Sequence, residues 1–111
     1  MIAQTKAATY DALRRRFPHI IPPDLLVVTA GVKALIKMGG PKAVMEVLDM
    51  TELGKLIQGY SRFDEDNDPY GEHDFGALEF RGQKLFWKID DYTEQPEPYR
   101  HVLTVMLADE Y

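Results

Sequence analysis

The side chains best suited to chemistry crowd into residues 64–76, which read D-E-D-N-D-P-Y-G-E-H-D-F-G. His73 stands there between two carboxylates, Glu72 and Asp74. A histidine beside a carboxylate can transfer protons near neutral pH, so these three residues are the candidates for catalysis. With a divalent ion they would form the site of a metal-assisted, hydrolase-type enzyme.

Oxygen ligands alternate through the same stretch, at Asp64, Asp66 and Asp68. Calcium-binding EF-hand loops also need glycine at the sixth position and glutamate at the twelfth, where this sequence has Pro69 and Phe75. The pattern therefore fails, and the sequence predicts no metal. A looser cation site would draw on Asp66, Asp68, Glu72, His73 and Asp74.

Other enzyme signatures are missing from the sequence. There is no G-x-S-x-G motif, no phosphate-binding glycine loop and no dinucleotide fingerprint, and Ser61 is the only serine. The absence of cysteine excludes disulfides, thiolate zinc sites and a cysteine nucleophile. We therefore favour a protein without enzymatic activity and expect no cofactor.

Two hypotheses without catalysis remain open for this stretch. In the first, the stretch only stabilises its own turn, because Asn and Asp side chains form hydrogen bonds with nearby backbone amides and Pro69 and Gly71 favour turns. In the second, it is a binding surface. The binding candidates are Asp64, Glu65, Asp66, Asp68, Tyr70, Glu72, His73 and Asp74.

The charge distribution favours a protein partner. The net charge is −5, but residues 64–98 carry eleven acidic and three basic side chains, a balance of −8. Such a segment repels nucleic acid and attracts a basic protein surface. We expect a protein partner with a basic surface and no direct nucleic-acid binding.

Length and hydropathy set the remaining limits. A chain of 111 residues with 45% hydrophobic residues is typical of one globular domain, here residues 1–111. Since no apolar run approaches the ~18–20 residues of a membrane span and no secretory signal is evident, we expect a cytoplasmic protein without a membrane partner. The oligomeric state stays open.

Periodicity predicts helices at residues 3–17, 31–38 and 41–58. Thr29 is expected to cap the second helix, after a short buried strand at 25–29. In the third, the apolar spacing slips near Thr51 and Gly54 weakens the interior, which predicts a kink or two shorter helices.

The last third of the sequence predicts strands. Residues 75–81 and 84–91 flank Gly82-Gln83, a sequence typical of a type II′ hairpin turn. That turn would place Leu78 opposite Trp87 on the core face and Phe86 on the other face. Residues 101–108 are apolar on both faces, which favours an inner strand over a helix.

Four separated motifs resemble a known family. They are V-T-A-G-V at 28–32, N-D-P-Y-G-E-H-D-F-G at 67–76, F-W-K-I-D at 86–90 and V-L-T-V-M-L-A-D-E-Y at 102–111. Together they resemble DUF3768, a bacterial family of unknown function. The resemblance implies a small cytoplasmic protein that is often carried on mobile elements, and it supplies no catalytic residues.

The sequence thus predicts an α+β fold, with N-terminal helices packed on a small, mainly antiparallel sheet that includes a C-terminal hairpin and a final strand. Residues 1–60 are expected to be mainly helical, 61–75 an acidic loop and 75–111 β-rich. The leading functional hypothesis is an accessory protein that binds a protein partner through this loop. One form of it is an anti-CRISPR-like inhibitor of a nucleic-acid-handling complex, because an acidic surface can occupy a basic channel.

Overall fold

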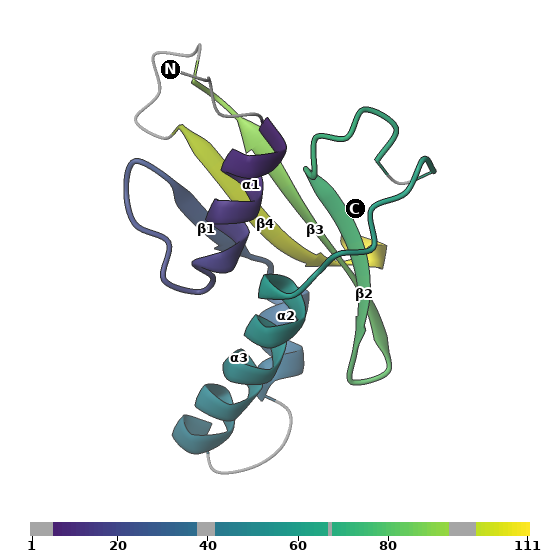
Figure 1. The fold of residues 1–111 in the computed structure, drawn as a ribbon. Coiled ribbons are helices and arrows are strands. Elements are labelled where there is room, and N and C mark those ends of the chain that lie inside the picture. Colours follow the sequence, from purple (N-terminus) through teal and green to yellow (C-terminus); the bar gives the residue numbers. More distant parts are fainter. Residues whose placement is uncertain (1–5, 38–41, 67, 94–99) are drawn as a thin grey trace.

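The computed structural model describes residues 6–37, 42–66, 68–93 and 100–111. Within these ranges three helices accompany a four-stranded mixed sheet, which confirms the α+β fold (Figure 1). Parts of the predicted first, second and third helices (residues 3–5, 38 and 41) lie outside the described residues.

The sheet has the strand order β1-β4-β3-β2. Its strands are β1 (Leu25–Val28), β2 (Phe75–Phe80), β3 (Gln83–Asp91) and β4 (His101–Leu107). β1 runs parallel to β4 at one edge, and the other two pairings are antiparallel. The choice of a strand over a helix for β4 is confirmed. The first strand lies at an edge and none of its residues is fully buried, so the prediction of a buried strand there is wrong.

The predicted hairpin register is wrong. Leu78 lies opposite Leu85, and Gly76 lies opposite Trp87. The two turn residues are Arg81 and Gly82, with φ angles of 54° and 75°, rather than Gly82 and Gln83. Positive φ at both central positions is the geometry of a type I′ turn, whose twist matches that of the strands.

Three helices cover the sheet: α1 (Lys6–Arg15), α2 (Ala30–Lys37) and α3 (Lys42–Gln58). The predicted kink or break near Thr51 is wrong, because α3 runs as a single helix of 17 residues. Leu53 and Ile57, one turn apart, are both fully buried. Burial of this face in the core outweighs the low helix propensity of the intervening glycine.

The start of α2 is capped by the chain's distant end rather than by Thr29. The Glu110 carboxylate, on the short 3-10 helix η1 (Ala108–Glu110), accepts hydrogen bonds from the Gly31 amide (3.1 Å) and the Thr29 hydroxyl (2.6 Å). These bonds hold the pKa of Glu110 below its ordinary value. The predicted Thr29 cap is therefore wrong, since that hydroxyl donates to Glu110 instead of accepting from the helix.

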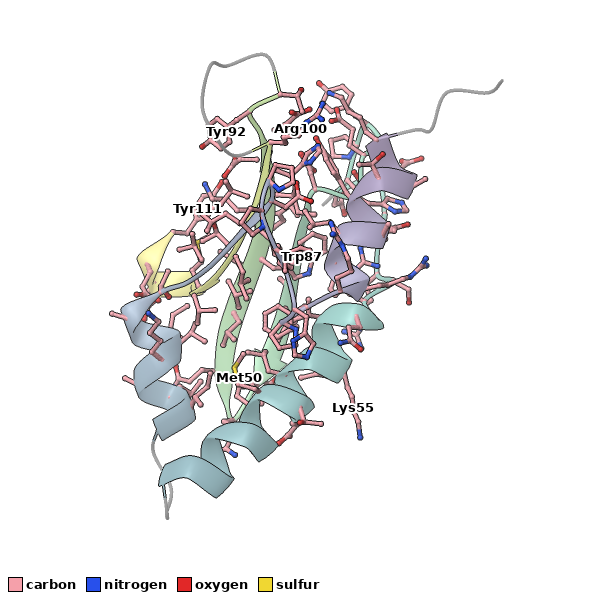
Figure 2. The ribbon with its side chains drawn as sticks, turned by 90° about the vertical axis from the view of Figure 1, so that its left-hand side faces the viewer. Met50, Lys55, Trp87, Tyr92, Arg100 and Tyr111 are labelled. Atoms are coloured by element: carbon pink, nitrogen blue, oxygen red, sulfur yellow. The ribbon has the colours of Figure 1, made fainter. Side chains whose placement is uncertain are left out.

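The core lies between the sheet and the helices, with Trp87 at its centre. Figure 2 places Trp87 between the strands and α1, with Tyr111 on the other side of the sheet. Trp87 is 0% exposed, and the hydrophobic cluster to which it belongs draws residues from all three helices and all four strands. On the opposite face Phe86 is covered by the rings of Phe75 and Tyr111, at centroid distances of 5.0 and 5.5 Å. The predicted inward face of the hairpin is therefore correct although its register is not.

Candidate functional site

The acidic stretch after α3 closes into a turn around Asp68. The Asp68 side chain is only 4% exposed. Its Oδ1 atom accepts hydrogen bonds from the backbone amides of Glu72 (2.9 Å) and His73 (3.2 Å), and its own amide donates to the Asp64 carbonyl (2.8 Å). Gly71, with φ of 62°, supplies the positive angle that the turn requires. Asp68 therefore fixes the backbone on both sides of the exposed tip.

His73 joins this turn to α1. Its Nδ1 atom lies 3.0 Å from Asp11 Oδ1, and its Nε2 atom lies 3.7 Å from Asp68 Oδ2. Its ring stacks on Phe63 at 3.8 Å with an interplanar angle of 3°. Its φ of 58° is uncommon outside glycine, and the two amide bonds to Asp68 at this position offset the cost.

Arg14 is the buried cation behind His73. Its guanidinium is 2% exposed and donates to the carbonyls of Ile57 (2.8 Å) and Tyr60 (3.0 Å) and to Asp11 (2.8 Å). It also lies over the rings of Phe63 and Trp87, at 5.4 and 5.3 Å from their centroids. Arg14 thus connects the end of α3, the turn and the core.

Two carboxyl groups near the turn have shifted pKa values. Burial raises the pKa of Asp11, but hydrogen bonds and charges from Arg14 and His73 outweigh it, so the net pKa is lowered. Burial raises the pKa of Asp74, and the nearby carboxylates of Glu72 and Asp68 raise it further. The ionised form is therefore disfavoured at Asp74 and favoured at Asp11.

The three candidates for catalysis make contacts with different partners. Glu72 pairs with Lys6 at 3.5 Å, while His73 directs each ring nitrogen at a different aspartate, Asp11 and Asp68. Asp74 is half-buried and its carbonyl accepts from the Ile89 amide (2.8 Å). No cluster of three or more His, Cys, Asp or Glu side chains suited to a metal ion is found in the described part of the chain. The hydrolase hypothesis stays a prediction without a shared site to support it.

The binding candidates fall into an outer and an inner set. Tyr70 is 84% exposed at the tip, and three acidic residues before it are exposed as well: Asp64, Glu65 and Asp66. Asp68 and His73 point inward and hold the turn in place. Glu72 and Asp74 are half-buried between the two sets.

Sequence reasoning missed Asp11 and Arg14, although a signal was present. Tyr10, Leu13, Arg14 and Phe17 follow the spacing of one helix face, and all four are buried. In the sequence this arginine is the first of three, Arg14 to Arg16, so it resembles a cation that complements the dipole at the end of a helix. An arginine in phase with an apolar stripe indicates a buried partner, which here is the pair of carbonyls at the end of α3.

A second polar group, also missed, lies where α1 meets β4. His101 Nδ1 lies 3.0 Å from Asp24, which accepts a hydrogen bond from Arg16 at 2.8 Å. Burial and the nearby Asp91 raise the pKa of Tyr10 to about 12. These contacts tie α1 and the residues that follow it to the sheet.

Comparison with known proteins identifies the family. The sequence matches a family described as a protein of unknown function, DUF3768, over residues 28–110. The chain belongs to the DUF3768 family. No curated protein and no solved structure matches it. The acidic turn, residues 64–66 and 68–72, lies inside the DUF3768 range, whereas the α1 residues that contact it and His73 lie outside.

None of the described helices has the length and apolar character that a bilayer crossing requires.

Proposed function

We propose that this DUF3768 protein binds a partner protein with a basic surface through its acidic turn, residues 64–66 and 68–72. The observation that carries the proposal is Tyr70, which is 84% exposed on a turn whose backbone is fixed by the buried Asp68. A large aromatic side chain held in water on a rigid support loses little entropy on binding, and tyrosine is enriched among residues that dominate interface energies.

The charges around Tyr70 support a basic partner. Asp64, Glu65 and Asp66 are exposed beside it, in a segment whose acidic side chains outnumber the basic ones by eight. Such a field speeds the encounter with a basic surface and disfavours acidic partners. Because Asp68 and His73 are already bonded within the protein, the turn needs little rearrangement to bind.

A finer form of the proposal concerns the partner's role. An acidic, rigid surface can occupy a channel that normally holds the phosphates of a nucleic acid. We therefore propose, as the form to test first, an anti-CRISPR-like inhibitor of a nucleic-acid-handling complex, carried on a bacterial mobile element. The partner would supply lysine and arginine side chains that the exposed carboxylates pair with.

Site-specific crosslinking in the native host tests the proposal. A photoreactive phenylalanine is placed at Tyr70 and, in a matched control, at Tyr111, which is 76% exposed on a different part of the protein. We expect an adduct with a basic protein from position 70 alone. It should be lost when Asp64, Glu65 and Asp66 are changed together to lysine.

Two results would overturn the proposal: no adduct specific to position 70, or an adduct that survives the charge reversal. A thermal-shift assay with calcium, magnesium, manganese and zinc tests the alternative, a metal-assisted hydrolase. A metal-dependent rise in Tm that is lost in His73→Ala would favour an enzyme.

A further inference from the structure

The outer edge of the sheet at β2 carries backbone groups available for pairing. β2 is the last strand in the order β1-β4-β3-β2, and no described strand lies beyond it. The Ala77 amide donates outward, to the Tyr60 hydroxyl at 3.3 Å, whereas the Ile89 amide bonds inward to the Asp74 carbonyl. In an antiparallel strand the amide and carbonyl of one residue face the same side, and residues two apart share that side. The backbone amides and carbonyls of Ala77 and Glu79 therefore point away from β3.

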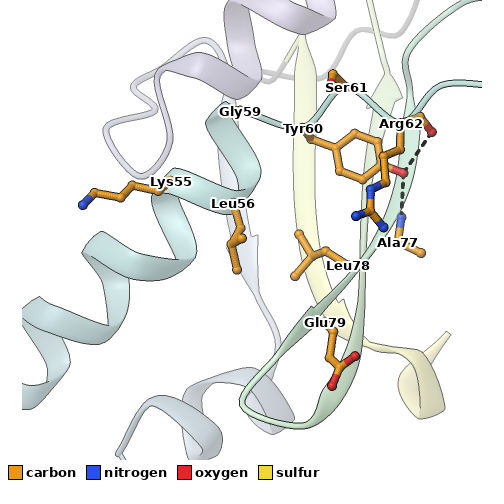
Figure 3. Close-up of a pocket in the computed structure, with 9 residues that line it drawn as sticks. All are labelled: Lys55, Leu56, Gly59, Tyr60, Ser61, Arg62, Ala77, Leu78 and Glu79. Atoms are coloured by element: carbon orange, nitrogen blue, oxygen red, sulfur yellow. Dashed lines mark hydrogen bonds between the residues drawn. The ribbon is translucent and has the colours of Figure 1, made fainter.

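One amide of this edge is already occupied, and no strand lies opposite the neighbouring groups in the part of the chain that the structure describes. The Tyr60 hydroxyl that accepts from Ala77 donates in turn to the Arg62 carbonyl at 3.3 Å (Figure 3). Segment 60–62 therefore closes the edge at the Ala77 amide. The Ala77 carbonyl and both backbone groups of Glu79 follow without a strand opposite them in the described part of the chain. This is the spacing that one residue of an added strand would satisfy.

Two hollows adjoin the edge and share Arg62 and the β2 residues 77–79. One of about 390 Å³ lies between the last turn of α3 and β2, with Leu56 and Leu78 on its walls (Figure 3). A second, also about 390 Å³, extends toward the hairpin tip at Gly82 and Lys84. Lys84 is on the opposite sheet face from Leu78. Side chains of a β-strand alternate between the two faces, so alternate side chains of an added strand would lie on the face of Leu78 and the others on the face of Lys84, within reach of the hollows.

The positive charge around the two hollows favours an acidic occupant. Their charged residues are Lys55, Arg62, Lys84 and Glu79, a balance of +2 in a chain of −5. Lys55 points away from β2 in Figure 3, whereas Arg62 lies directly beside the edge. Two copies joined edge to edge would bring these cations together, and the repulsion between them disfavours a second copy as the occupant.

We propose that the β2 edge at Ala77–Glu79 binds an extended segment of a partner protein with alternating acidic side chains, as an added β-strand. This surface is separate from the acidic turn and opposite to it in charge. Main-chain hydrogen bonds would supply affinity, and the two hollows would supply selectivity.

The test uses a labelled eight-residue peptide that alternates glutamate and valine, with blocked ends. We expect saturable binding below about 1 mM, with amide shift changes in the NMR spectrum at residues 77–79 and 55–62. A lysine–valine peptide and a glutamate–valine peptide methylated at alternate backbone nitrogens should each bind at least about tenfold more weakly.

Variants separate the edge from general electrostatics. Glu79→Pro removes the outward amide at an edge position where proline is tolerated, and it should abolish binding. Lys84→Glu should weaken binding about tenfold, while Lys33→Glu, an exposed position of α2, should not change it. Glu79→Lys, which adds a cation, should strengthen it.

Four results would overturn the inference: no saturable binding, equal binding of the glutamate and lysine peptides, shift changes confined to the acidic turn, or unchanged binding by Glu79→Pro. Concentration-dependent dimerisation that Glu79→Pro removes would assign the edge to a second copy and would also overturn it.

Discussion

Replacement of Arg14 by methionine tests the proposition that a buried cation on α1 fixes the acidic turn. Methionine keeps most of the side-chain length and apolar stem, so the loss is dominated by polar contacts. Arg14 donates to Asp11 and to the carbonyls of Ile57 and Tyr60. Without it, both carbonyls lose a buried donor and Asp11 loses its nearest cation.

The expected magnitude follows from these contacts. A hydrogen bond from a charged group contributes about 1.5–3 kcal/mol, but burial of the guanidinium costs part of that sum. Breaking a buried pair by removal of one partner typically costs about 3–5 kcal/mol, which we expect for Arg14→Met. Arg14→Lys keeps the charge but not the planar fork, and it should lose less.

Urea unfolding followed by tryptophan fluorescence measures the effect. Trp87 is the only tryptophan, is fully buried, and lies beneath the Arg14 guanidinium, so its emission reports on this region. The midpoint should fall by about 2 M in Arg14→Met at an ordinary slope. Arg15→Met, an exposed neighbour on the same helix, should change the free energy of unfolding by at most about 0.5 kcal/mol. Equal effects of the two substitutions, or a loss below about 1 kcal/mol in Arg14→Met, would refute the reasoning.

Two further substitutions probe the packing and the electrostatics of the site. In Gly76→Ala the new methyl group would meet the Trp87 indole nitrogen and lie 2.6 Å from Tyr60 Cζ, so we expect a loss of about 1–3 kcal/mol in urea unfolding; a neutral result would show that the two rings move aside freely. Asp74→Asn should raise the urea midpoint at pH 7, because a carboxyl group with a raised native pKa destabilises the fold when ionised. The gain should shrink as the pH falls through the two pKa values and vanish below about pH 3, where the aspartate is neutral in both states, and a gain that persists there would contradict the electrostatic explanation.

The hairpin shows which features of a sheet can be predicted from sequence. Side chains alternate with a period of two, and the true register differs from the predicted one by an even number of positions. Leu78, Leu85 and Trp87 therefore share the inward face in both. The turn could not be predicted in the same way, because Arg81 adopts a positive φ angle that glycine would normally provide. The local preference for glycine at the first turn position was overridden by the packing of both strands.

The candidate site depended on contacts that local patterns do not encode. The compact turn was predicted as one hypothesis because aspartate and glycine favour turns, and its hydrogen bonds lie within about five residues of Asp68. Its anchors lie far away: Asp11 is 62 positions from His73, and Arg14 is 46 positions from Tyr60. The Thr29 cap failed for the same reason, since its replacement, Glu110, is 81 positions away. Hydrogen bonds between residues close in the sequence could be predicted, whereas contacts between distant residues could be seen only in the folded structure.

The position of α1 outside the family range has a structural consequence. DUF3768 similarity covers residues 28–110, but Tyr10, Leu13 and Phe17 are buried in the same core as Trp87. A segment limited to the matched range would expose the face of the sheet that α1 covers (Figures 1 and 2). It would also leave His73 without Asp11 and the end of α3 without Arg14. The family range therefore contains the exposed turn and the sheet beneath it, while α1 supplies contacts that fix this turn, as the proposed binding surface would require.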